Sequence, residues 1–143
     1  MTMIVIHHNP DCGTSRNVLA IIRAAGYDPK VIDYLNEGWS RPQLLALFAA
    51  SNLKPSEALR KTKSLAKELG LLENGLCEDN ILEHMVEYPV LVNRPIVCTS
   101  KGVKLCRPSE AVLELLHKKP KGPFFKKDGE LLIDENGNIQ IKP

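Results

Sequence analysis

Residues 3–16 read Met-Ile-Val-Ile-His-His-Asn-Pro-Asp-Cys-Gly-Thr-Ser-Arg. Residues 3–8 form a nearly continuous apolar run, which is typical of a short strand buried on both faces. The Asn-Pro-Asp triplet at 9–11 is a turn signal that ends this strand. From Thr14 onward, apolar residues recur at helical spacing. This stretch therefore predicts a strand, a tight turn that bears Cys12, and a helix.

The helix should end before Gly26, because glycine readily adopts the left-handed conformation that follows many helices. Residues 30–35 then read as a second strand, and a β-α-β unit of this kind favours a parallel pair with a right-handed crossover. Residues from about 37 to 89 change character and predict a helical insertion. Its expected helices open at a Ser40–Gln43 capping box, start near Pro55, cover residues 64–69, and run from Asp79 or Asn80 to Glu87.

Strands return at residues 95–99 and 103–106, and the Ser-Lys-Gly triplet between them predicts a hairpin. A helix should open at Pro108, because apolar residues at helical spacing follow it. The whole order is β-α-β, insertion, β-β-α, so we predict an α/β protein with a thioredoxin-like core and a single domain over residues 1–143. The tail from about residue 118 carries turn signals that predict a weak terminal hairpin, with Asp128-Gly129 and Asn136-Gly137 around Leu131-Leu132-Ile133 and Ile139.

Composition and charge exclude several classes of function. The chain is 43% hydrophobic, enough for a core, and its net charge of +2 is too small to favour a nucleic-acid partner. Residues 118–127 are basic but broken by proline and glycine, which is typical of a solvated connector. The longest apolar stretch, residues 44–50, falls far short of the roughly 18 residues of a membrane span. No targeting signal is visible, and we expect a cytoplasmic protein.

The cysteines lie at positions 12, 77, 98 and 106, and no pair has the two-residue spacing of a zinc site or a thioredoxin dithiol. No pair of histidines has metal-ligand spacing either, so we expect no metal. Cytoplasmic thiols are normally kept reduced, and most of these cysteines are expected to be small buried side chains. Cys12 is the exception, because it lies between a strand and a helix.

Backbone N–H groups at a helix N-terminus favour a thiolate, so the position of Cys12 predicts a reactive cysteine rather than an inert one. An ordinary cysteine, with a pKa near 8.5, is only about 3% ionised at neutral pH. Making it mostly thiolate requires about 2.7 kcal/mol, whereas a helix end usually supplies roughly 0.3–1 kcal/mol. Further support is therefore expected, and the hydroxyl of Ser15 and the side chain of His8 are the candidates.

Two other cysteine chemistries fail on spacing. A phosphatase loop between strand and helix needs an arginine six positions after the cysteine, and that position is Val18 here. Dithiol exchange needs a second cysteine where this chain has Ser15.

Four blocks of the sequence together resemble the glutaredoxin-coupled arsenate reductases, over nearly the whole chain to about residue 116. They are His-His-Asn-Pro-Asp-Cys-Gly-Thr-Ser-Arg-Asn at 7–17, Leu59-Arg60, Pro-Val-Leu-Val-Asn-Arg-Pro-Ile-Val at 89–97, and Leu-Cys-Arg-Pro-Ser-Glu at 105–110.

The resemblance implies an enzyme that reduces arsenate to arsenite through a thiol–arsenate intermediate on Cys12. It implies glutathione as co-substrate, glutaredoxin as partner, and no bound cofactor. The implied supports of the thiolate are His8 and Ser15. The implied substrate-binding residues are Arg60, Arg94 and Arg107, and the thioredoxin-like fold suggests a cis peptide before Pro95.

The chemistry of these residue types agrees with the resemblance. A thiolate that attacks arsenate meets another negative charge, and arginine offers a planar, permanently charged fork that pairs with oxyanions. Each charge-assisted hydrogen bond is worth about 1.5–3 kcal/mol, so a group of three arginines offsets much of that repulsion.

Two alternatives remain open from the sequence. Spx-type transcription regulators, which bind RNA polymerase, share the expected fold, although they usually carry a Cys-x-x-Cys switch that Ser15 interrupts here. A monothiol, glutathione-linked reductase of another substrate is the second alternative. The three arginines argue against it, because a protein–glutathione disulfide does not need such a cationic group.

Overall fold

The computed structural model describes residues 3–73, 75–120, 124–125 and 131–133. The chain forms two compact units. The first, here called the sheet unit, consists of Met1–Ile32 and Arg94–Pro143. The second, the helical unit, is Asp33–Asn93, and it contains the predicted insertion. No helix in the described ranges is long and apolar enough to cross a membrane.

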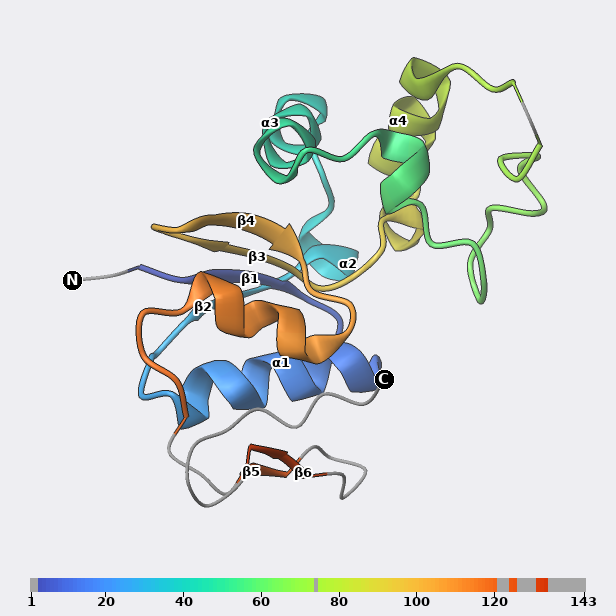
Figure 1. Ribbon diagram of the computed structural model, residues 1–143. Helices are drawn as coiled ribbons and strands as arrows, with labels where there is room; N and C mark the ends of the chain where they lie inside the picture. The colour runs from blue at the N-terminus through green and yellow to red at the C-terminus, as the bar shows by residue number, and fades with distance from the viewer. Residues whose placement is uncertain (1–2, 74, 121–123, 126–130, 134–143) are drawn as a thin grey trace. The chain divides into compact units, whose positions relative to one another are not determined.

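The sheet unit is built on four strands in the order β2-β1-β3-β4. Helix α1 carries the chain back between β1 and β2, which are neighbours in the sheet (Figure 1). Strand β3 pairs antiparallel with β1 and forms a hairpin with β4. The predicted strand–helix–strand unit and hairpin are therefore present. The elements are β1 Val5–His8, α1 Gly13–Ala24, β2 Lys30–Asp33, β3 Ile96–Thr99 and β4 Gly102–Leu105.

One face of the sheet is covered by α1 and by η3, Ser109–Leu115 (Figure 1). Side chains alternate along a strand, so Ile4 and Ile6 point to the same face and enter this core. Burial of these residues fixes the start of α1 at the end of β1, which is where the cysteine loop lies. The other fully buried members of the core include Val18, Ile21, Ile22, Val97, Cys106 and Val112.

The helix predicted after Pro108 is a 3-10 helix, not an α-helix. Ser109, Val112, Leu113 and Leu115 are buried within it. The apolar pattern was read correctly as helical, but the spacing of its buried residues does not distinguish the two forms.

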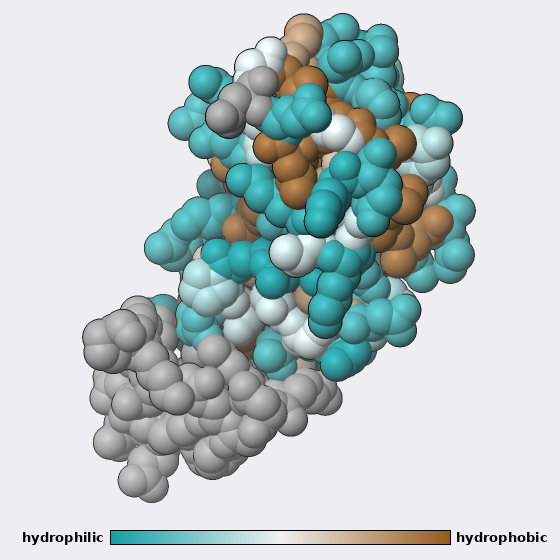
Figure 2. All heavy atoms as spheres, turned by 90° about the vertical axis from the view of Figure 1, so that its right-hand side faces the viewer, coloured by the Kyte–Doolittle hydropathy of each residue, from teal (hydrophilic) through white to brown (hydrophobic). Residues whose placement is uncertain are grey.

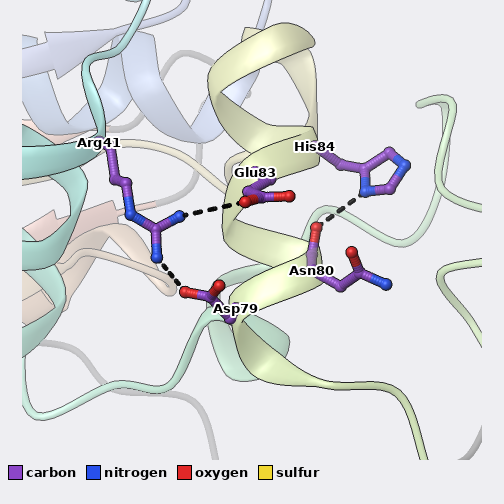
Figure 3. Close-up of polar contacts among 5 residues, drawn as sticks. All are labelled: Arg41, Asp79, Asn80, Glu83 and His84. Carbon is purple, nitrogen blue, oxygen red and sulfur yellow. Dashed lines mark hydrogen bonds and ion pairs between the residues drawn. The ribbon is translucent and has the colours of Figure 1, made fainter.

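The helical unit contains α3, Arg41–Ser51, and α4, Glu78–Glu87. The predicted capping box is present: Gln43 N donates to Ser40 Oγ at 3.2 Å, and Ser40 N donates to Gln43 Oε1 at 3.3 Å. Arg41 at the start of α3 pairs with Asp79 and Glu83 of α4 (Figure 3). The short elements of this unit are α2 Tyr34–Glu37, η1 Pro55–Ala58 and η2 Pro89–Leu91.

The helical piece predicted over residues 64–69 is a single turn and not a full helix. Leu69 N donates to Leu65 O at 3.0 Å, and Leu71 N donates to Ala66 O at 2.8 Å. Gly70 has a φ of 72°, the left-handed conformation that ends a helix, and it follows the turn directly.

Strands β1, β3 and β4 differ from their predicted bounds by one or two residues, and two further boundaries differ because of a helix N-cap. The second strand ends at Asp33, whose side chain accepts a hydrogen bond from Leu35 N and opens α2, so the strand does not reach residue 35. Helix α4 begins directly after Cys77 rather than at Asp79 or Asn80. The N-cap of α4 is thus Cys77, two or three residues before the predicted cap.

The tail begins closer to the sheet unit than a solvated connector would. Lys118 N donates to the Tyr27 hydroxyl at 3.0 Å, and the Lys118 ammonium lies 5.2 Å from the Tyr27 ring centroid. Strands β5, Phe124–Phe125, and β6, Leu131–Ile133, pair antiparallel. A terminal strand pair is thus present, but β5 lies in the stretch predicted as connector. The turn dipeptides Asp128-Gly129 and Asn136-Gly137, and Ile139, lie outside the described residues.

The face drawn in Figure 2 is mainly hydrophilic, with smaller hydrophobic patches between charged and polar side chains. Leu65 and Leu72 are among the exposed hydrophobic residues of the helical unit, at 39% and 44% exposure.

Candidate active site around Cys12

The loop after β1 holds Cys12 at the first position before α1. Asn9 shapes this loop: its Oδ1 accepts a hydrogen bond from Asp11 N at 2.9 Å, and its carbonyl accepts one from Cys12 N at 3.1 Å. Arg16, one turn into α1, donates from Nη1 to Pro10 O at 2.8 Å. Hydrogen bonds from the strand side and from the helix side therefore fix this loop. Cys12 has the extended conformation of an N-cap residue, with φ −97° and ψ 123°.

A buried network lies beneath the loop. Ser15 Oγ lies 2.6 Å from His8 Nδ1 and accepts a hydrogen bond from Asn9 N at 3.1 Å. All three residues are at most 7% exposed. This network joins the end of β1 to the first turn of α1, so it fixes the direction in which the helix N-terminus points.

The pairing of the strands brings two of the predicted arginines to the same end of the sheet. In the antiparallel register, His7 lies opposite Ile96, so the loop that follows β1 meets the residues that precede β3. Arg94 lies in that segment. Ile96 in turn lies opposite Leu105, which places Arg107, just after β4, at the same edge.

Arg107 contacts the nucleophile directly. Its Nη1 lies 3.7 Å from Cys12 Sγ and donates to Arg94 O at 3.1 Å. The peptide between Arg94 and Pro95 is cis, as the resemblance implied, and Pro95 O accepts a hydrogen bond from Cys106 N at 2.9 Å. The sheet unit therefore gathers Cys12, Arg94, Arg107 and Pro95 at one site.

Electrostatics at this site favour a thiolate. Burial by itself raises the pKa of the Cys12 thiol. The backbone N–H of Ser15, the positive charge of Arg94, and hydrogen bonds from both arginines act against burial, and the net pKa lies below its ordinary value. The site combines a nucleophile of lowered pKa with two permanent cations, which suits attack on an oxyanion.

The sequence profile of the ArsC family matches residues 7–115 of this chain. The chain belongs to the ArsC family. It is 68% identical over 136 residues to Arsenate reductase ArsI2 of Synechocystis sp., covering 95% of this chain and 97% of that protein. It is 46% identical over 137 residues to an arsenate reductase of Escherichia coli strain K12, covering 96% and 97%.

Solved structures of the family have the same fold. An arsenate reductase from Vibrio cholerae aligns with a TM-score of 0.76 and 37% sequence identity, covering 80% of this chain and 98% of that chain. The predicted family and the predicted thioredoxin-like α/β class are confirmed.

The third arginine of the ArsC resemblance, Arg60, lies in the helical unit. Its backbone N donates to Leu91 O at 2.8 Å, and its side-chain Nε donates to Thr62 O at 3.1 Å. The neighbouring residues Leu59 and Val92 form a β-bridge. These bonds fix the backbone of Arg60 within its own unit.

The structure refines the expected role of Ser15 and adds a residue that was not predicted. The sequence assigned support of the thiolate to the Ser15 hydroxyl, whereas that hydroxyl bonds to His8 and Asn9, and the backbone N–H of Ser15 is one of the groups that lower the pKa of Cys12. Asn9 was not predicted as a site residue. The sequence contained a signal for this role, because the side chain of an asparagine in a tight turn commonly accepts a hydrogen bond from the backbone N–H two residues further on.

The remaining thiols and histidines have other environments. Burial raises the pKa of Cys98, and it raises the pKa of Cys106 to about 12, so both stay protonated at neutral pH. Burial lowers the pKa of His7 to about 4, which keeps its imidazole neutral. Within the described residues, no group of three or more His, Cys, Asp or Glu side chains is arranged to hold a metal ion.

Replacing Arg107 with glutamine should raise the pKa of Cys12, because a cation that contacts the sulfur is lost. The measurement is site-specific alkylation of Cys12 by iodoacetamide across a pH series, read by mass spectrometry. Reactivity requires the thiolate, so its midpoint should move to higher pH in the variant. Arg41→Gln removes an arginine of the helical unit and serves as control. An unchanged midpoint in Arg107→Gln would show that this cation does not support the thiolate.

Replacing Asn9 with alanine should lower the free energy of unfolding by about 1 kcal/mol, because Asp11 N loses its acceptor. The measurement is urea unfolding followed by circular dichroism. Asn36→Ala is the matched control: Asn36 is exposed and donates to Asp33 Oδ2, so its loss should change stability by less than about 0.5 kcal/mol. Equal losses in the two variants would contradict a special role for Asn9.

Proposed function

We propose that this ArsC-family protein is an arsenate reductase that uses Cys12 as nucleophile, glutathione as co-substrate and glutaredoxin as thiol partner. The observation that supports it most is the Cys12 sulfur, with a lowered pKa, 3.7 Å from an Arg107 guanidinium nitrogen. The names of the relatives in Synechocystis and Escherichia coli point to the same substrate.

The arginines make this attack feasible. Arsenate is an anion at neutral pH, and a thiolate that approaches it is repelled. Arg94 and Arg107 carry fixed positive charges beside the sulfur, so they attract the anion and the nucleophile to one place. Because both are guanidinium groups, they pair with two oxygen atoms of the substrate and orient the remaining As–O bond for displacement.

Arg60 is proposed as a third ligand of the oxyanion, on the strength of the family resemblance. Within the helical unit, the backbone next to Arg60 is held by a hydrogen bond from Asn93 N to Ala58 O at 2.7 Å.

The proposed reaction runs in three steps. First, the Cys12 thiolate attacks arsenic(V), an S–As bond forms, and one oxygen leaves as water after protonation. Second, the glutathione thiol displaces another oxygen as water and forms a second S–As bond. Third, a glutaredoxin thiolate attacks the sulfur of the bound glutathione.

The electrons balance in the third step. A disulfide forms between glutaredoxin and glutathione, and the electron pair of the broken S–As bond stays on arsenic, which becomes arsenic(III). Water then cleaves the remaining S–As bond, which releases arsenite and restores the Cys12 thiol. Two thiols supply the two electrons. No bound cofactor enters these steps, and the reduced thiols they require fit the cytoplasm.

The first test is Cys12→Ser, assayed for arsenite release from arsenate with glutathione and glutaredoxin present. The hydroxyl of serine does not ionise at neutral pH and forms no S–As bond, so turnover should be abolished. Cys77→Ser is the matched control, because Cys77 is exposed and outside the site. Turnover by Cys12→Ser at the rate of the unaltered protein would end the proposal.

The second test is Arg60→Gln. Loss of one charge-assisted hydrogen bond to the oxyanion, worth about 1.5–3 kcal/mol, should lower kcat/KM for arsenate by about 10- to 150-fold. The pH dependence of Cys12 alkylation should stay unchanged if Arg60 binds substrate only. Arg41→Gln again controls for loss of an arginine in the same unit. Unaltered kcat/KM in Arg60→Gln would remove Arg60 from the site while leaving the roles of the other two arginines standing.

A further inference from the structure

A groove of about 490 Å³ lies along α1, next to the cysteine loop, and none of the steps above assigns it a role. Leu19 and Ala20 of α1 and Pro10 of the loop give it an apolar lining. Two exposed arginines, Arg16 and Arg23, lie among the lining residues. The buried ring of His8 forms part of the wall.

The two arginines are spaced in a defined way. Arg16 and Arg23 are seven residues apart, so they lie on the same face of α1 and are separated by about 10 Å along its axis. Helix α1 contains no acidic residue, and none of the lining residues is acidic. The groove is thus apolar along its middle and positively charged near both ends, which suits a short peptide with a carboxylate at each end.

We propose that this groove binds glutathione, an inference that rests on the proposed function for the role of that tripeptide. An extended tripeptide spans about 10–11 Å, which matches the separation of the two arginines. Glutathione carries a carboxylate at each end, and the volume of the groove falls in the range of small-molecule sites, about 300–1,000 Å³. Arg16 and Arg23 pair with the two carboxylates, and the apolar lining contacts the methylene groups between them.

The groove also lies next to the loop that carries the nucleophile, Cys12. Pro10 lies two residues before Cys12, and Arg16 lies one turn after it. His8 connects the groove to the thiolate, because its Nδ1 is 2.6 Å from the hydroxyl of Ser15, the residue whose backbone N–H supports Cys12. A tripeptide held here is next to the loop on which the arsenic adduct forms.

The test uses S-methylglutathione, a thioether that keeps both carboxylates but cannot react. It is titrated into the reduced full-length protein, and its dissociation constant is measured by calorimetry. Arg23 is the residue to change, because Arg16 also holds Pro10 O in the loop. We expect Arg23→Gln to weaken binding about tenfold, Arg23→Lys to weaken it less, and Arg41→Gln to leave it unchanged.

Steady-state assays give a second, independent readout. Arg23→Gln should raise KM for glutathione, while KM for arsenate and the midpoint of Cys12 alkylation stay the same. Equal affinity of Arg23→Gln and the unaltered protein for S-methylglutathione would overturn the proposal that the groove binds glutathione. A change in KM for glutaredoxin alone would also overturn it, because it would identify this face as a protein-docking surface.

The failure of the groove and the failure of the proposed function are distinguishable. Binding of S-methylglutathione does not depend on arsenate. If binding requires Arg23 but no arsenite is formed, the glutathione site is supported and the proposed activity is contradicted. If arsenite is formed but binding does not depend on Arg23, only the glutathione site is contradicted.

Discussion

The structure around Cys12 depends on one balance: this residue is only 7% exposed, yet its sulfur must still be able to ionise. Burial removes water from the thiolate and raises its pKa, so the protein has to replace the lost hydration with fixed donors and charges. The Ser15 N–H at the helix start does part of this, and Arg94 and Arg107 do the rest. A helix end alone usually supplies only about 0.3–1 kcal/mol, so the two guanidinium groups add to the stabilisation of the thiolate.

These groups come together because of the sheet. Cys12 and Arg107 are 95 residues apart, and the β1–β3–β4 register is what brings their ends of the chain to one edge. A one-residue slip in that register would turn the side chains of β3 to the opposite face. The buried pair Ile6 and Val97, together with the buried Ile96 opposite Leu105, makes such a slip unfavourable. Core packing therefore sets the electrostatics of the site indirectly.

Sequence patterns predicted the elements that are determined by local signals in the side chains. The apolar run before Asn9, the capping box at Ser40 and the turn before Gly102 are local signals, and the elements follow them. Support of Cys12 by backbone N–H groups was predicted from its position before a helix, but the residue that supplies it, Ser15, was not, because every residue except proline has that group. The single turn before Gly70 was predicted as a helix, because the spacing of apolar residues does not show how many turns form before the closing glycine.

The other thiols of the chain show why the site needs its cations. Cys106 is fully buried, and burial raises its pKa to about 12 although Lys104 lowers it somewhat. Cys98 also has a raised pKa through burial. Cys12 is also buried, at 7% exposure, yet its pKa lies below the ordinary value for a cysteine. The N–H and guanidinium groups directed at the Cys12 sulfur lower its pKa, and burial opposes them less strongly there than at Cys106. Nucleophilic character in this fold is thus a property of the position at the start of α1, and moving a cysteine elsewhere in the core would give an inert thiol.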